Sequence, residues 1–217
     1  MKRTALAVLC LSLVGAIAVV PASADAPLYS TLGPSGQYDA TGGWEISGSN
    51  YSNQAVGNPF SLGSGATVGD AQLALASVTG NNNPMNVYIE SDSGGVPGSI
   101  IASLTQVGTI PAFGGGGGLV TFDCSDPACT LAAGAYWLVA VQPDAATSQG
   151  WLYSYNDVAA NIAVDHTGSP TGLVAAGSQK GNGFEIDGAA TPEPSSFLLL
   201  GSGLAGLAGM LRRKLRA

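Results

Sequence analysis

The residue types that catalysis requires are scarce in this chain. Its 217 residues include one histidine, His166, which follows Asp165 at the end of a predicted strand and precedes a Thr-Gly pair typical of a turn. A Ser-His-Asp triad needs a serine presented on a sharp turn, and the chain has no Gly-x-Ser-x-Gly sequence to present one. We therefore predict that His166 lies in an exposed turn and has no catalytic role.

Carboxylates form two pairs with the spacing of a strand face, Glu90 with Asp92 and Glu185 with Asp187. Residues two apart point to the same side of a strand, and paired carboxylates are what glycoside hydrolysis uses. In the segment that begins at Asn86, the alternation places Glu90 on a wet face opposite an apolar one. We interpret both pairs as solvated strand faces and keep a secreted polysaccharide hydrolase as an alternative.

The chain has no sequence motif for a metal or a cofactor. A calcium loop of the Asp-x-Asp-x-Asp-Gly type is absent, so calcium would need oxygen donors from separate loops. The sequence leaves such a site open, and its candidate donors are Asp92, Asp123, Asp126 and Asp144. We predict no other cofactor.

An aromatic row at Trp151, Tyr153 and Tyr155 has the same alternating spacing. In a strand the three rings would share one face, where they could stack against sugar rings. A carbohydrate-binding module that uses this face is therefore one interpretation. The opposite face of the segment is less apolar, which favours the other interpretation, that the rings point into the core.

Two cysteines, Cys124 and Cys129, enclose a Ser-Asp-Pro-Ala segment whose Asp-Pro pair favours a tight turn. The spacing is not C-x-x-C and no histidine lies nearby, which argues against a zinc or redox site. A disulfide is the expected state of such a pair in an oxidising compartment. We predict a disulfide that closes a small loop at the end of a hairpin.

Short apolar segments, separated by Gly, Asn, Asp, Ser and Pro, organise the chain. The sequence contains 32 glycines and 10% charged residues. This pattern is typical of an all-β protein, and we predict an antiparallel β-sandwich or jelly-roll-like single domain over residues 25–190. Its expected strands are 44–47, 71–78, 86–91, 119–123, 135–142, 151–156, 162–165 and 184–187.

The first 24 residues have the pattern of a signal peptide. Lys2 and Arg3 precede an apolar stretch, and Ala22 and Ala24 provide the small residues that signal peptidase prefers at its cleavage site. We expect cleavage after Ala24, so that the mature chain is exported and begins at Asp25.

The C-terminal segment, residues 191–217, begins with Pro192, Glu193 and Pro194, which keep the backbone extended. An apolar run over 197–211 follows. As a helix it would span about 22 Å, short of the ~30 Å hydrocarbon core of a bilayer. This length suits transient retention in the inner membrane better than permanent anchoring.

A basic cluster that includes Arg212 and Arg213 ends the chain and, by the positive-inside rule, should stay cytoplasmic. The leader and the tail hold six of the seven Lys and Arg residues. Residues 25–190 therefore carry one basic residue against thirteen acidic ones, a formal charge of −12. So acidic a segment cannot neutralise phosphates, which excludes nucleic acid as a partner.

The Pro-Glu-Pro sequence, the short Gly-, Ala- and Leu-rich helix and the Arg-rich end together resemble the PEP-CTERM sorting signal of Gram-negative bacteria. The resemblance implies recognition by exosortase, an integral-membrane processing enzyme, and an association with exopolysaccharide and biofilm matrix. Residues 86–98 and 133–138 resemble the choice-of-anchor R type of surface domain, which has no assigned catalysis. We therefore expect a non-enzymatic protein of the cell surface or extracellular matrix.

Overall fold

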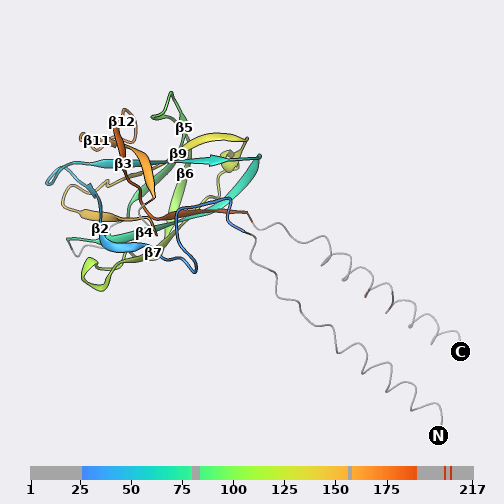
Figure 1. The fold of residues 1–217 in the computed structure, drawn as a ribbon, viewed down its shortest axis with the longest axis horizontal. Coiled ribbons are helices and arrows are strands. Elements are labelled where there is room, and N and C mark those ends of the chain that lie inside the picture. The colour runs from blue at the N-terminus through green and yellow to red at the C-terminus, as the bar shows by residue number, and fades with distance from the viewer. Residues whose placement is uncertain (1–25, 80–83, 156–157, 190–202, 204–205, 207–217) are drawn as a thin grey trace, which may run out of the picture.

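The computed structural model describes residues 26–79, 84–155 and 158–189, together with Gly203 and Gly206 (Figure 1). The predicted signal peptide and the predicted sorting tail, apart from those two glycines, lie outside the described residues. Between 26 and 189 the described chain is built from strands and two 3-10 helices. The elements are β1 Tyr29–Ser30, β2 Asp39–Ser47, β3 Ala55–Leu62, β4 Ala66–Ser77, β5 Asn86–Asp92, β6 Pro97–Val107, η1 Phe113–Gly115, β7 Gly118–Asp123, η2 Pro127–Cys129, β8 Thr130–Leu131, β9 Gly134–Val141, β10 Ser148–Tyr153, β11 Ala159–Asp165, β12 Val174–Lys180 and β13 Phe184–Gly188.

The strands pair antiparallel throughout. A first sheet has the order β1-β13-β4-β7-β6, with β10 beside β4 and β2 beside β10, and a second sheet has the order β6-β5-β9-β3-β11-β12. β6 pairs with β5 from Pro97 to Leu104 and with β7 from Thr105 to Val107, so the two sheets are one curled sheet folded over itself. The predicted antiparallel all-β class is confirmed.

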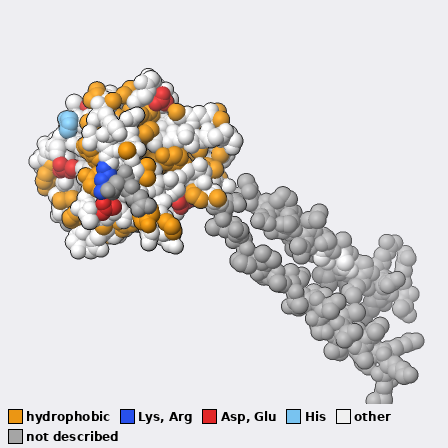
Figure 2. Space-filling model, in the orientation of Figure 1, with side chains coloured by type: hydrophobic (Ala, Val, Ile, Leu, Met, Phe, Trp, Pro, Cys, Tyr) orange, Lys and Arg blue, Asp and Glu red, His pale blue; other side chains and the backbone are white. Residues whose placement is uncertain are grey.

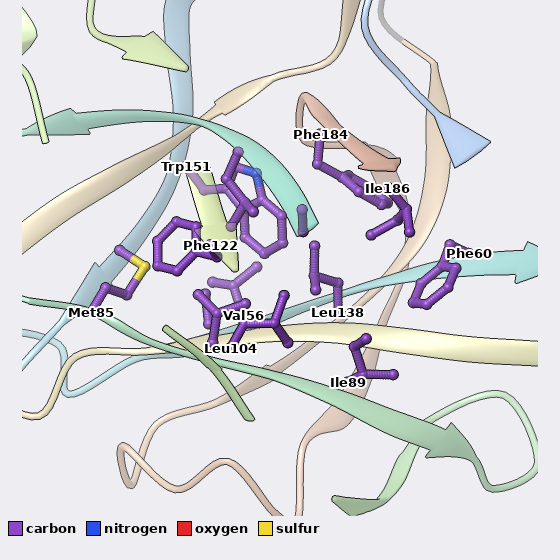
Figure 3. Packing of buried hydrophobic residues seen from close by; sticks show 14 of the residues in the cluster. Val56, Phe60, Met85, Ile89, Leu104, Phe122, Leu138, Trp151, Phe184 and Ile186 are labelled. Carbon is purple, nitrogen blue, oxygen red and sulfur yellow. The ribbon is translucent and has the colours of Figure 1, made fainter. Parts of the chain in front are cut away.

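The main core lies between the two layers. Trp151 and Phe184 come from the first sheet and meet edge to face, with ring centroids 5.9 Å apart, while Leu138 and Ile89 enter from the second (Figure 3). All four are fully buried or nearly so. Burial of each such side chain contributes roughly 1.5–3 kcal/mol, so this cluster is the main stabilising element of the domain.

Each layer also buries a smaller cluster on its outer face. On the second sheet Trp137 and Val139 pack with Leu173, which follows β11, and on the first sheet Leu152 packs with Tyr38 from the chain before β2. Several strands are therefore apolar on both sides. Trp137 lies in a central strand, because β9 lies between β5 and β3.

The two chain ends of the domain lie side by side. The Leu28 amide donates to the Ile186 carbonyl at 2.8 Å, and the Ala189 amide donates to the Thr67 carbonyl at 2.8 Å. Both ends thus leave from one end of the sandwich, which we call the near end (Figure 1). The far end is the other end of the strands, where β3 and β5 begin and β9 and β11 end.

A buried polar network crosses the core. The Asn58 side chain on β3 donates to Asn182 Oδ1 at 2.9 Å, and the Asn182 backbone amide donates to Asn58 Oδ1 at 3.2 Å. Asn182 Nδ2 in turn donates to the Trp151 carbonyl. Both asparagines are buried, at 1% and 0% exposure. Because the network joins the two sheets through directional bonds, it specifies how they face each other.

A disulfide joins Cys124, after β7, to Cys129 in η2, with their Cα atoms 6.2 Å apart. Asp126 caps the short helix inside this loop by accepting from the Ala128 amide at 2.8 Å.

Replacing both cysteines with serine should lower the free energy of unfolding by about 2 kcal/mol, because the bridge closes only a small loop. Urea unfolding of the oxidised wild-type protein and the double variant would measure the difference. Equal midpoints and slopes for the two proteins would show that the bridge does not stabilise the fold.

Candidate functional site

A pocket of about 290 Å³ opens at the far end of the domain. Three loops surround it: the loop between β2 and β3, the loop after β9, and the loop after β11. The first residues of β5 and the last of β9 form its floor. Its lining residues are Gly48, Ser49, Asn53, Asn86, Tyr88, Val141, Gln142, Pro143, Ala145, Gly168 and Pro170.

The lining is polar but uncharged. It combines three side-chain amides, of Asn53, Asn86 and Gln142, with the phenol of Tyr88 and the rings of two prolines. Gln142 is 4% exposed, and its Oε1 accepts from the Asp144 amide at 3.1 Å. Its Nε2 has no hydrogen-bond partner among the described residues. A buried amide donor without a partner is costly, which makes this corner of the pocket unusual.

The loops around the pocket have defined conformations. Asn53 adopts a left-handed conformation at φ 51°, and its amide donates to the Gly48 carbonyl at 3.3 Å. Gly168 is also left-handed, at φ 71°, and a Cβ there would lie 2.5 Å from Asn53 Oδ1. Glycine is therefore favoured at this point, where the two loops touch.

Acidic side chains beside the pocket are used within their own loops. Asp165 accepts from the Thr167 hydroxyl at 2.6 Å and from the Ser169 amide at 3.0 Å. Desolvation opposes ionisation of Asp165, but these bonds, the Thr167 amide and the nearby His166 outweigh it and lower its pKa. Asp144 accepts from the Ala146 amide at 2.7 Å. These contacts shape the loops that border the pocket.

The aromatic row does not form an exposed platform. Trp151 is fully buried in the main core, and its indole nitrogen donates to the Gly183 carbonyl at 3.1 Å. The pairing of β10 with β2 shifts between Leu152 and Tyr153, so the alternation ends there. The prediction that Trp151, Tyr153 and Tyr155 form a glycan-binding platform was thus wrong. The alternative, that the rings point into the core, holds for Trp151. It does not hold for the two tyrosines, which lie half-buried outside that core.

Tyr153 has a different role. The Lys180 ammonium lies 4.4 Å from the centre of its ring, and the same ammonium forms an ion pair with Asp39 at 2.5 Å. The Lys180 side-chain hydrogen bond, with those from Thr41, lowers the Asp39 pKa to about 2. On the face that Figure 2 shows, blue atoms lie close to red ones. The single basic side chain of residues 25–190 is thus engaged within the fold.

Neither carboxylate pair is placed at the pocket. Asp92 Oδ1 accepts from the Trp137 indole at 2.8 Å, and Glu90, beside it on the outer face of the second sheet, is 0% exposed. Our placement of Glu90 on a wet face was wrong, because the outer cluster around Trp137 covers this face. Neither Glu90 oxygen has a partner among the described residues, and desolvation raises its pKa to about 7.

The second pair lies on the outer face of the first sheet. Asp187 stands opposite Asp70, which in turn stands opposite Asp123 on β7. Desolvation, followed by the charges of Asp187, Asp123 and Glu185, raises the Asp70 pKa. This row belongs to the near end of the domain, so the structure does not bring it to the pocket.

The four candidate calcium donors lie apart. Asp92 and Asp144 lie at opposite ends of the β5–β9 pair, roughly 20 Å from each other along the strands. Asp126 caps η2 and Asp123 belongs to the acidic row. Over the described ranges, no group of three or more His, Cys, Asp or Glu side chains could hold a metal ion together.

His166 is exposed at the far end, in the turn that Asp165 closes, as the sequence predicts. The pocket itself was missed by sequence reasoning. Its residues come from segments more than 100 residues apart, and most of them are of types that are common in turns. The one local signal is the concentration of Asn and Gln next to predicted strand ends.

In the comparison with known families, residues 190–214 match a model described as the PEP-CTERM protein-sorting motif. The matched segment contains Pro192, Glu193, Pro194, Arg212 and Arg213, which lie outside the described residues. Searches of curated proteins and of solved structures return no match. The resemblance of residues 86–98 and 133–138 to a choice-of-anchor R domain receives no support.

The match shows that the chain carries a PEP-CTERM sorting motif, which indicates an exported protein that is sorted through its C-terminus. It implies processing at the membrane by an exosortase-type enzyme. Within the described parts of the chain, no helix has the length and apolar character needed to cross a membrane.

Proposed function

We propose that this chain, whose C-terminal segment carries a PEP-CTERM sorting motif, is a non-enzymatic protein that exosortase-type processing delivers to the cell surface or the extracellular matrix. The match to the sorting motif over residues 190–214 is the observation that carries this proposal. The N-terminal segment supports it, because Lys2, Arg3 and the small residues Ala22 and Ala24 form a signal-peptide pattern.

The domain between the two signals suits display outside the cell. It is a disulfide-containing β-sandwich with few charged groups and one lysine, which is held by Asp39 and Tyr153. Trypsin-like proteases cut after Lys and Arg, so residues 25–190 offer them one site, inside the ordered pairing of β12 with β11. His166 is exposed, and no carboxylate lines the pocket at the far end; both observations support a non-enzymatic role.

Mass spectrometry of both termini of the mature protein tests the proposal. We expect an N-terminus at Asp25, and we expect residues 197–217 to be missing in wild-type cells but present in cells that lack the processing enzyme. If residues 197–217 persist in wild-type cells, the segment is a plain membrane anchor and the sorting proposal is wrong.

A further inference from the structure

We propose that the pocket at the far end binds neutral sugar residues of a polysaccharide. The proposal rests on the surface display proposed above, because display would bring the pocket into contact with such a ligand. The pocket volume of about 290 Å³ is at the lower end of small-molecule sites, which begin near ~300 Å³. Such a volume suits one small unit of a longer chain rather than a large cofactor.

The chemistry of the lining favours a ligand rich in hydroxyl groups. Each side-chain amide of Asn53, Asn86 and Gln142 offers both a donor and an acceptor, as adjacent hydroxyls of a sugar do. Gln142 Nε2 is a donor that no described residue satisfies. The partly exposed ring of Tyr88 adds an apolar surface against which sugar C–H groups can pack.

The same lining disfavours anionic ligands. No charged side chain lines the pocket, and residues 25–190 carry a formal charge of −12. Lys180, the one basic residue of that segment, pairs with Ala159, at the opposite end of β11 from the pocket loop. Phosphorylated or acidic saccharides would therefore meet repulsion without a compensating cation.

The position of the pocket agrees with surface binding. The chain leaves the domain at the near end, where Leu28 pairs with Ile186, whereas the pocket lies beyond Val141 at the far end. The length of β9, from Gly134 to Val141, separates these ends by roughly 25 Å. A protein attached to the surface through the C-terminal side of this domain would carry the pocket at the end away from the attachment.

Titration of the full chain, purified in detergent, with short neutral oligosaccharides of glucose, galactose and mannose tests this proposal. We expect saturable binding to at least one of them and none to matched polyuronate oligosaccharides. Asn86→Ala should weaken binding about tenfold through lost hydrogen bonds, and Tyr88→Phe, which keeps the packing of the ring, about threefold. Asn161→Ala, an exposed asparagine on β11, is the control and should change nothing.

Absence of binding across the neutral panel, stronger binding of polyuronates, or unchanged affinity in both pocket variants would overturn the proposal. Near-ultraviolet circular dichroism checks that each variant is folded, and Tyr88→Phe decides the question if Asn86→Ala unfolds. The masses of the two termini report on sorting independently. A correctly processed protein that binds no neutral saccharide would refute the pocket proposal and leave the proposed function intact.

Discussion

Replacing Asn182 with alanine should lower the free energy of unfolding by about 3 kcal/mol. The substitution leaves the Asn58 amide group and the Trp151 carbonyl without the partners that Asn182 supplies, in a part of the core that water does not reach. Each buried polar group left unsatisfied costs about 1–3 kcal/mol.

Urea unfolding followed by tryptophan fluorescence would measure this loss, since the buried Trp151 reports on the same region. Asn161→Ala is the matched control, because that asparagine is exposed, and it should shift stability by no more than ~0.5 kcal/mol. A loss below ~1 kcal/mol for Asn182→Ala would mean that water or a rearranged side chain satisfies the freed groups.

Glu90 should make the wild-type protein less stable as the pH rises from about 4.5 to about 7. Desolvation raises the pKa of the folded-state carboxyl from its ordinary 4.5 to about 7, so the folded protein holds a proton that the unfolded chain has released over this range. Stability falls with pH wherever the folded state binds more protons. The change corresponds to about 3 kcal/mol, complete once the pH exceeds 7.

Glu90→Gln removes this ionisation and keeps the shape of the side chain. Above pH 7 we expect the variant to be more stable than the wild type by up to ~3 kcal/mol, whereas near pH 4 the two proteins should differ little. Chemical denaturation at several pH values measures the difference. A constant difference between the two proteins across this range would show that Glu90 is hydrated and titrates normally.

The strands predicted from the sequence are those whose residues alternate or are continuously apolar, and each corresponds to an observed strand. β3 was missed because Gly57, Asn58 and Pro59 resemble a turn. In the structure β11 pairs with β3 only as far as Gly57, so Pro59 lies where that side of β3 has no partner strand. The fold tolerates the missing amide of proline at such a position.

β6 was missed for a different reason. Its pairing with β5 shifts twice, which breaks the alternation and leaves Ile100 exposed. Glu90 stands opposite Trp137, which comes from a distant part of the chain, so no local pattern could reveal its burial. The pocket likewise exists only after three loops meet. Local periodicity thus predicted the class of fold but not the contacts that define the candidate site.

The pairing of β13 has a mechanical consequence for a domain held by its C-terminal side. The chain leaves directly after β13, which is bonded to β4 along its length and to β1 at Glu185 and Ile186. A pull between a bound ligand at the far end and the tail runs parallel to these strands, so it loads their hydrogen bonds in shear and all together. Peeling would break them one at a time. The domain should therefore resist force best along the line that joins its C-terminal attachment to a ligand bound at the far end.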